Sequence, residues 1–293
     1  MDQRLTILSN PVAGGRRSIE IVERLRSQHP SARIITSSEP AGARDLVRGL
    51  SLDQSDTLAV LGGDGTIHQT VSGLFEGRVD ALPTLAIFPC GSGNALATAL
   101  NINSTLTAEE TLREGHERSI DVAKVETDTG TSHAINVIGW GLSARVTLLG
   151  DKMRSSRGLP YTRAALRELL FGDIAAVDAR YDAGSEEKDL LGLACLTPLA
   201  GGSMPVAPGA LLDDGELDLV RVKPTSRLPL LVLFARLTKG WHLSSKSIEH
   251  RRARRLQIQF DALQDLVVDG EMQTTRALSI EVIPRALRVL TPS

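Results

Sequence analysis

Three glycine-rich turns in the first hundred residues constrain the fold most strongly, because each turn directly follows a short apolar run. The turns are residues 10–15 (NPVAGG), 62–66 (GGDGT) and 89–94 (PCGSGN). The runs before them, with one further run, are residues 5–9, 33–36, 57–61 and 84–88. Each run has the length and composition of a β-strand.

Helical stretches separate these strand candidates. We expect helices over residues 18–28, 42–50 and 67–75, and a further one from Asn94. Strands that alternate with helices predict βαβ units around a parallel sheet. Ligands bind beyond the carboxyl ends of the strands in such sheets, which is where the three glycine turns fall.

The pattern changes at about residue 120, where short apolar runs separated by turns predominate. These runs are residues 120–125, 134–138, 190–196, 217–222, 256–260, 266–268 and 278–283. They predict an antiparallel β-sandwich, with one helical interruption at residues 161–171. We expect the acidic residues 185–189 to form a solvated loop.

Composition excludes several classes of protein. The net charge is 33 − 35 = −2 and aromatic residues make up 3% of the chain, so neither a basic footprint nor a stacking platform for nucleic acid is present. The two cysteines, Cys90 and Cys195, form no CxxC motif and indicate intracellular thiols. No apolar run reaches 18 residues and no signal peptide is evident, so we expect a cytoplasmic protein.

Glycine-rich turns after parallel strands let backbone N–H groups approach a phosphate, and a following helix adds its positive dipole end. Plain connections between strands and helices are the alternative for any single turn. The chain has no GxxxxGK[ST] motif and no GxGxxG motif, which excludes a P-loop and leaves a Rossmann dinucleotide site unsupported. None of the six lysines lies in a glycine turn, so backbone amides, metal ions and arginines would have to neutralise a phosphate.

Asp64 stands between glycines in the second turn. A carboxylate beside bound phosphates is unfavourable unless a Mg²⁺ ion or a transferable proton intervenes. The alternative is a turn or helix-capping role. The Gly-Gly-Asp-Gly-Thr context favours the metal-associated role.

The motifs resemble those of the diacylglycerol kinase catalytic-domain family, which includes sphingosine and ceramide kinases. The resemblance rests on the three turns and on four later segments: residues 136–142 (NVIGWGL), 201–208 (GGSMPVAP), 212–218 (LDDGELD) and 268–271 (VDGE). It spans nearly the whole chain in the family's order. It implies an α/β ATP-binding domain over residues 1–119, completed by residues 284–293, and a β-sandwich lipid-binding domain over residues 120–283.

The resemblance also implies a site. The positions that would contact ATP are Asn10, Gly14, Thr36, Gly62, Gly63, Asp64, Gly65, Thr66, Ile67, His68 and Ser92. Asp64 and Asp121 would share a Mg²⁺–water network. A second, structural Mg²⁺ would be held by the Asp214 carboxylate and the main-chain carbonyls of Leu211 and Glu216; a plain turn between strands is the alternative there.

Two carboxylates are candidates for the base that accepts the proton of a lipid hydroxyl. Glu271 resembles the base of bacterial diacylglycerol kinases, and Asp64 resembles the base proposed for sphingosine kinases. We favour Glu271, with Asp64 holding the water-bound Mg²⁺. Without the resemblance, Asp269-Gly270 would be interpreted as a hairpin turn.

Two positions depart from the family pattern. Ala95 stands where bacterial diacylglycerol kinases usually have an aspartate, which removes one carboxylate from the implied magnesium network. Arg145 stands where sphingosine and ceramide kinases have an aspartate. An arginine would repel a sphingoid amine, so we expect a lipid alcohol without a free amine.

The sequence therefore predicts a kinase of phospholipid biosynthesis that phosphorylates a diacylglycerol-like or ceramide-like alcohol. The alternatives are an NAD kinase-like phosphotransferase and a catalytically silent lipid-binding homologue. We expect reversible, peripheral membrane association and consider a homodimer. The cluster Arg251, Arg252, Arg254 and Arg255 would either dock on anionic lipid or protect a strand edge.

Overall fold

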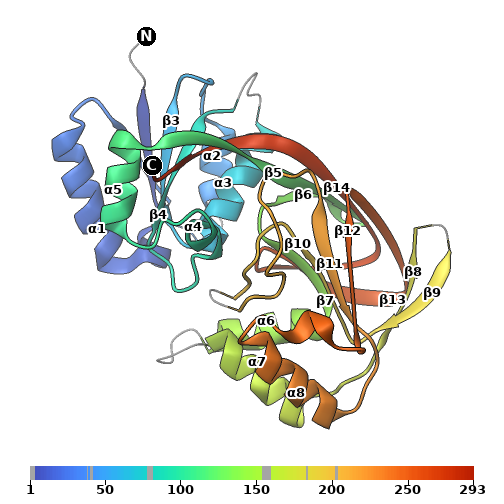
Figure 1. Ribbon diagram of the computed structural model, residues 1–293. Coiled ribbons are helices and arrows are strands. Elements are labelled where there is room, and N and C mark those ends of the chain that lie inside the picture. The colour runs from blue at the N-terminus through green and yellow to red at the C-terminus, as the bar shows by residue number, and fades with distance from the viewer. Residues whose placement is uncertain are drawn as a thin grey trace. The chain divides into compact units, whose positions relative to one another are not determined.

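A computed structural model describes residues 4–37, 39, 42–77, 82–153, 160–182, 184–201 and 204–293. The chain forms two compact units, each with its own internal contacts. One unit comprises Met1–Val122 with Pro284–Ser293, and the other comprises Ala123–Ile283. The long strand β14 (Glu271–Thr291) begins in the second unit and ends in the first (Figure 1).

The first unit is built on a parallel sheet, as the alternating pattern predicts. Its strands are β1 (Leu5–Ser9), β2 (Arg33–Thr36), β3 (Thr57–Gly62) and β4 (Thr84–Pro89), in the order β4-β3-β1-β2, with the end of β14 beside β4. Every pair is parallel. The strand order reverses at β1 and β3, the kind of switch point at which α/β sheets bind ligands.

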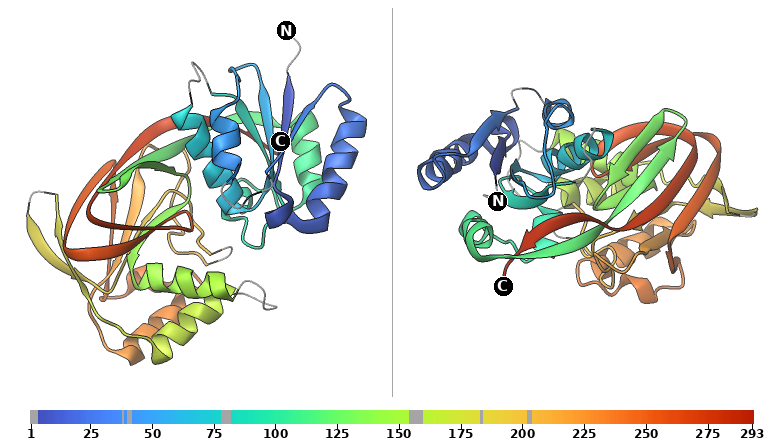
Figure 2. Two further views of the ribbon diagram at one scale, coloured as in Figure 1. Left: turned by 180° about the vertical axis from the view of Figure 1, so that it is seen from behind. Right: turned by 90° about the horizontal axis from the view of Figure 1, so that it is seen from above.

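Helices cover both faces of this sheet. Helices α1 (Pro11–Gln28) and α5 (Thr105–Glu114) lie on one face, and α2 (Gly42–Arg48) and α3 (Asp64–Glu76) lie on the other (Figures 1 and 2). All residues of β3 and β4 are buried, as expected for strands covered on both sides. The short helix α4 (Ala95–Ala99) follows the third turn, where a helix was predicted. Helix α5 was not predicted; the Ser104 hydroxyl caps it by accepting a hydrogen bond from the Thr107 N–H at 3.0 Å.

The second unit is antiparallel. Its strands are β6 (Gly130–Ala134), β7 (Val137–Gly141), β8 (Val177–Tyr181), β9 (Ser185–Asp189), β10 (Leu191–Cys195), β11 (Leu217–Val222), β12 (Ile248–Ala253) and β13 (Arg255–Val268), with β5 (His116–Thr127) and β14 shared with the first unit. The pairings run β12-β11-β10-β7-β13-β14, and β8 pairs with β13. This architecture confirms the predicted antiparallel sandwich.

Three helices belong to the same unit: α6 (Leu142–Lys152), α7 (Pro160–Phe171) and α8 (Arg227–Leu237) (Figure 1). Only α7 was predicted. They share an apolar cluster that includes Leu142, Leu169, Leu230 and Leu233. None of the helices that the structure describes is long and apolar enough to cross a bilayer.

Several predicted strands in this unit have different bounds. Residues 134–138 are not one strand, because they contain the turn between β6 and β7. Residues 256–260 and 266–268 belong to one strand, β13, whose pairing with β14 shifts register between Gln259 and Gln264. A register shift of this kind is a bulge, and it interrupts the apolar pattern without ending the strand.

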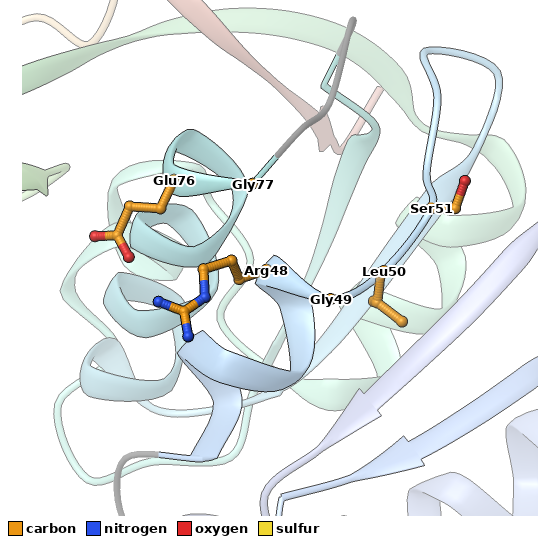
Figure 3. A pocket seen from close by; sticks show the side chains of 6 residues that line it. All are labelled: Arg48, Gly49, Leu50, Ser51, Glu76 and Gly77. Carbon is orange, nitrogen blue, oxygen red and sulfur yellow. The ribbon is translucent and has the colours of Figure 1, made fainter.

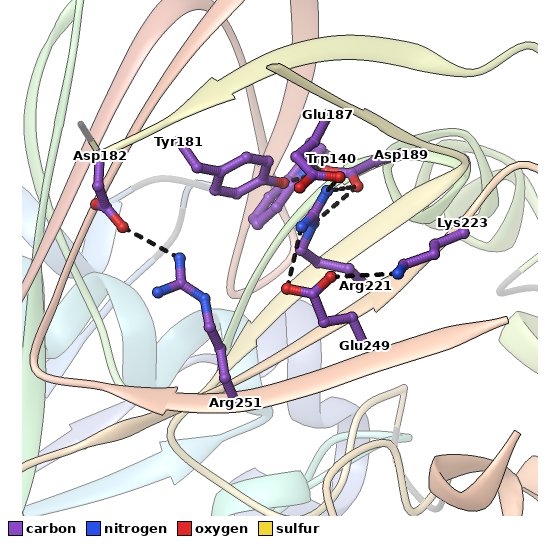
Figure 4. A network of polar contacts seen from close by, with 9 residues as sticks. All are labelled: Trp140, Tyr181, Asp182, Glu187, Asp189, Arg221, Lys223, Glu249 and Arg251. Carbon is purple, nitrogen blue, oxygen red and sulfur yellow. Dashed lines mark hydrogen bonds and ion pairs between the residues drawn. The ribbon is translucent and has the colours of Figure 1, made fainter. Parts of the chain in front are cut away.

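The predicted solvated loop at residues 185–189 is wrong, because these residues form β9 and pair with β8. Asp189 is completely buried and accepts hydrogen bonds from Arg221 Nε at 2.8 Å and Trp140 Nε1 at 3.1 Å (Figure 4). The Tyr181 hydroxyl donates to the same carboxylate. Burial, and then the neighbouring Asp189 carboxylate, raises the pKa of Tyr181 well above its usual value. The network keeps a buried charge paired and explains why an acidic segment forms a strand.

Candidate functional site

The three glycine turns of the first unit are joined by hydrogen bonds at the carboxyl ends of the parallel strands. The Asn10 N–H donates to the Leu61 carbonyl at 3.1 Å, and the Cys90 N–H donates to the Gly62 carbonyl at 3.0 Å. The Asn10 side chain donates through Nδ2 to Thr66 Oγ1 at 3.2 Å. Because β3 lies between β1 and β4, the turn after β3 bonds to both of its neighbours.

The second and third turns approach each other closely through backbone atoms. A Cβ atom on Gly91 would lie 2.4 Å from the Cα of Gly63, and one on Gly63 would lie 3.0 Å from the Cα of Gly91. Glycine is required at this approach because any side chain would push the two turns apart. The two turns therefore form one continuous backbone surface.

Asn94 closes the third turn. Its Oδ1 accepts from the Gly91 N–H at 3.0 Å, and its Nδ2 donates to the Gly91 carbonyl at 2.8 Å. Asn94 has the left-handed backbone conformation, with φ of 57°. Asparagine tolerates this conformation better than most residues, so the side chain and the backbone of Asn94 both shape the loop.

Asp64 is the first residue of α3, which follows the second glycine turn directly. The first N–H groups of a helix have no acceptor within the helix and carry the positive end of its dipole. The Asp64 carboxylate is half-buried, and its Oδ1 accepts from the Leu96 N–H, at 3.4 Å, in α4. A partly accessible carboxylate beside amide donors fits a cation or its water shell facing bound phosphate.

The predicted nucleotide-contact residues differ in exposure in the structure. Thr66, Ile67 and His68 are buried on α3, so their side chains pack within the first unit. Gly65, Thr36 and Ser92 are exposed, at the α3 N-terminus, the end of β2 and the third turn. Gly14 lies in the first turn of α1, just before Gly15 (φ 58°, ψ −150°) interrupts the helix.

Asp121 is buried, and its Oδ1 accepts from the Arg285 N–H at 2.7 Å. Arg285 has a φ of 50°, so this carboxylate supports an uncommon backbone turn in the last segment of the first unit. The described residues include no group of three or more His, Cys, Asp or Glu side chains arranged to hold a metal ion. The sharing of a magnesium network by Asp121 and Asp64 stays a prediction.

Glu271 lies at the start of β14, directly after a two-residue hairpin turn. Val268 of β13 pairs with Glu271, and Asp269 and Gly270 have φ of 49° and 97°. Two successive positive φ angles match a type I′ turn, so Asp269-Gly270 is indeed a hairpin turn. The turn presents the half-buried Glu271 at the end of the β13–β14 ladder.

Asp269 also anchors the hairpin to a neighbouring backbone segment. Its carboxylate accepts hydrogen bonds from three successive backbone N–H groups, those of Ile135 at 2.8 Å, Asn136 at 2.9 Å and Val137 at 2.8 Å. The Asp269 N–H donates to the Val137 carbonyl at 2.9 Å. These bonds attach the Glu271 hairpin to the segment that carries Asn136, and sequence reasoning did not find them.

The Asn136 side chain is buried, and neither its Oδ1 nor its Nδ2 has a hydrogen-bond partner within the described part of the chain. A buried amide without partners is costly, and such groups often serve a ligand. Asn136 is therefore a candidate contact for a polar group of the acceptor substrate. Its position in the Asn-x-x-Gly-x-Gly segment was the sequence feature that could have identified it.

An arginine occupies the acidic turn where a second metal was predicted. The Asp214 carboxylate is ion-paired with Arg252, whose guanidinium also lies 3.5 Å from Glu216 Oε2 and 3.9 Å from Asp218 Oδ2. Arg252 and Asp218 are direct partners in the β11–β12 register. Arg252 thus shares the Asp214 carboxylate, and the structural Mg²⁺ at Asp214, Leu211 and Glu216 stays a prediction.

The other arginines of the basic cluster are Arg251, on β12, and Arg254 and Arg255, directly after it. Strand β12 lies at the end of the strand order, beside β11. Arg251 pairs with Asp182 at 3.1 Å (Figure 4), and His250 Nε2 lies 2.5 Å from Asp218 Oδ1. Acidic side chains thus neutralise part of the positive charge that was considered for membrane docking. Of the GGSMPVAP segment, Gly202 and Ser203 lie outside the described residues.

Arg145 joins two helices of the second unit. Its guanidinium donates to the Asp173 carbonyl just beyond α7, and its Nε lies 3.7 Å from Glu168 Oε2. The side chain thus anchors the end of α7 to α6.

A hollow of about 450 Å³ lies away from the glycine turns, between the carboxyl ends of α2 and α3 (Figure 3). Residues Arg48, Gly49, Leu50, Ser51, Glu76 and Gly77 line it. Glu76 ends α3, about 18 Å along the helix from Asp64 at its start. The hollow is therefore separate from the candidate site.

The first unit has glycine-rich turns that suit a phosphate, at the carboxyl ends of a parallel sheet. An antiparallel sandwich follows it along the chain. This combination is typical of two-domain phosphotransferases. Residues 4–125 match the diacylglycerol kinase catalytic domain family, and residues 136–291 match the YegS C-terminal NAD kinase beta sandwich-like domain family. The chain belongs to the family of lipid kinases that joins these two domains. The family resemblance and the predicted enzyme class are thereby confirmed.

Individual relatives of the chain are also named as lipid kinases. The chain is 28% identical over 278 residues to a diacylglycerol kinase of Bacillus subtilis, covering 92% of this chain and 90% of the relative. It is 29% identical over 283 residues to a "Probable lipid kinase YegS-like" protein of Xanthomonas euvesicatoria, covering 93% and 91%. A crystal structure of a diacylglycerol kinase from Bacillus anthracis superimposes with a TM-score of 0.71 at 22% identity, covering 99% and 97%, which shows a shared fold.

Proposed function

We propose that this lipid kinase transfers the γ-phosphoryl group of ATP to the hydroxyl of a diacylglycerol-like or ceramide-like lipid. The observation that carries the proposal is the joined surface of glycine turns that ends in Asp64 at the start of α3. Backbone donors and a helix N-terminus suit a polyphosphate, and the absence of turn lysines leaves the remaining charge to a metal ion and to arginines.

The first unit would bind the nucleotide. The amides of the glycine turns would contact the phosphates, and Asp64 would hold a hydrated Mg²⁺ ion that neutralises charge on the transferred group. The buried positions Thr66, Ile67 and His68 would support the turn from within, while Thr36 and Ser92 would contribute at its surface.

The second unit would supply the base. The lipid hydroxyl oxygen attacks the γ-phosphorus, the bond from that phosphorus to the β–γ bridging oxygen breaks, and Glu271 accepts the hydroxyl proton. The products are ADP and a lipid phosphomonoester. Asp269 would position Glu271 through the hairpin, and the buried Asn136 amide would bind an oxygen of the acceptor.

The acceptor is proposed to lack a free amine. Arg145 stands where the sphingosine and ceramide kinases that the chain resembles carry an aspartate, and a guanidinium disfavours a nearby ammonium group. Its ion pair with Glu168 moderates that charge, so the expected discrimination between acceptors is modest.

The experiment that tests this function incubates the purified protein with labelled ATP, Mg²⁺, detergent-dispersed lipid alcohols and NAD. The panel contains diacylglycerol, ceramide and sphingosine. A labelled phosphomonoester of diacylglycerol or ceramide supports the proposal. Labelled NADP would identify an NAD kinase instead, and no labelled product with any acceptor would indicate a silent homologue.

A further inference from the structure

The outward faces of α7 and α8 carry the most exposed large apolar side chains in the described part of the molecule. Phe171 is 81% exposed and Leu228 is 72% exposed, ahead of every other large apolar residue there. Leu166 and Leu170 on α7 and Val232 on α8 are exposed as well. Large apolar groups gathered in this way mark an interaction surface on a soluble domain.

The two most exposed side chains belong to one structural joint. Arg227, at the start of α8, donates from Nη1 to the Leu169 carbonyl at 2.9 Å and from Nη2 to the Gly172 carbonyl at 2.7 Å. These bonds attach the first turn of α8, with Leu228, to the last turn of α7, with Phe171. The two side chains are therefore presented by helix ends that are hydrogen-bonded to each other.

Each helix buries its other face. Leu169 of α7 and Leu230 and Leu233 of α8 enter the same apolar cluster. On α8, Leu228, Val232 and Ala235 follow one another at helical spacing on the outward side. Neither exposed stripe is needed to complete this cluster, which leaves both stripes available to a partner.

Apart from Glu168 on α7 and Asp173 just beyond it, the charges close to these stripes are positive. Together the two helices contain Arg163, Arg167, Arg227 and Arg236 and a single acidic residue, Glu168, giving a net charge of 4 − 1 = +3. Glu168 is paired with Arg145. Apolar side chains flanked by basic ones match the interface of a bilayer that contains anionic lipid, where the apolar groups enter the acyl boundary.

We infer that the α7–α8 face, meaning the exposed stripes around Phe171 and Leu228, is the surface that docks on anionic membranes. The inference rests on the proposed function, because a kinase of lipid alcohols must reach a bilayer. It assigns docking to this face rather than to the β12 arginine cluster, whose Arg251 and Arg252 already have carboxylate partners.

The test is sedimentation of the full chain with vesicles of phosphatidylcholine and phosphatidylglycerol, without ATP or diacylglycerol. The variant Phe171→Gln/Leu228→Gln should raise the Kd for vesicles about tenfold or more, since it removes two side chains that would enter the membrane. The matched control is Leu106→Gln/Leu263→Gln, which replaces side chains 65% and 59% exposed elsewhere and should leave the Kd unchanged.

Two further variants separate the possible basic surfaces. Arg167→Gln/Arg236→Gln should weaken binding to anionic vesicles more than to pure phosphatidylcholine vesicles, and the loss should shrink at high salt. Replacing Arg251, Arg252, Arg254 and Arg255 with Gln should have the smaller effect. A larger loss from this second variant would overturn the assignment.

Other outcomes would also overturn the inference. One is a Phe171→Gln/Leu228→Gln protein that is folded, by thermal unfolding, and binds vesicles like the wild type. Another is wild-type dimerisation, by light scattering, that the same variant abolishes, because the face would then bind a second copy. Since binding is measured without turnover, a protein that docks but phosphorylates no lipid would refute the proposed kinase function and leave the docking surface standing.

Discussion

The glycine turns of the first unit and the Glu271 hairpin of the second are organised by opposite means. The second and third turns meet through backbone, with Gly63 and Gly91 in direct approach. The hairpin is held by a buried side chain, the Asp269 carboxylate, which binds three backbone amides. The close approach of two backbone turns depends on glycine, whereas the position of the Glu271 hairpin depends on the carboxylate of another residue.

Asp64→Asn should have the largest effect on activity. Removing the only charge placed among the turn amides should lower kcat by about a thousandfold, because the metal would lose its anionic partner. Circular dichroism and thermal unfolding should match the wild type. Asp45→Asn, an exposed residue of the first turn of α2, is the control and should retain full turnover.

Asp189→Asn should have the largest effect on stability. Arg221 would remain buried with its main partner neutralised, which should reduce the free energy of unfolding by about 3–5 kcal/mol. Denaturant titration measures this loss, and kcat per folded molecule should stay unchanged. A fall in kcat larger than the loss of folded protein would contradict the purely structural role of Asp189.

Asp269→Asn should affect stability and activity together. The asparagine amide would place an N–H group against backbone N–H groups that need an acceptor. The free energy of unfolding should therefore fall by about 2–3 kcal/mol. The hairpin should lose its attachment to Asn136, and kcat should fall more than KM for ATP rises. Asp265→Asn on the exposed side of β13 should change neither quantity. A normal kcat in folded Asp269→Asn protein would refute the positioning role.

Gly91→Ala should give the smallest of these effects. The new methyl group would lie 2.4 Å from the Cα of Gly63, so the second and third turns must separate. We expect kcat/KM for ATP to fall about tenfold, because the turns can separate by only part of the ~1 Å displacement of reacting groups that costs about a hundredfold. Gly209→Ala, where a Cβ meets nothing within 4 Å, is the control. Equal kinetics in the two variants would show that the contact between the turns is dispensable.

The same contrast explains what the sequence could predict. The turns of the first unit lie within a few residues of the strands they follow, so their pattern predicts both the parallel sheet and the place of a ligand. The Asp269 contact joins residues 133 positions apart along the chain, and no local pattern reveals such a pairing. Local patterns likewise missed β9, because its acidic residues are neutralised by Arg180–Glu186, Arg221–Glu187 and Arg221–Asp189 pairs that form only in the fold.

Substitution Glu271→Gln tests the division of roles between the two units most directly. Transfer to a lipid hydroxyl and the Kd for Mg²⁺–ATP should be measured on the same preparation, with Gln273→Glu/Glu271→Gln as a control for charge alone. The account predicts wild-type nucleotide affinity with kcat lower by about a hundredfold or more, because only the base is removed. Near-normal transfer, or a loss of ATP binding that matches the loss of transfer, would contradict it.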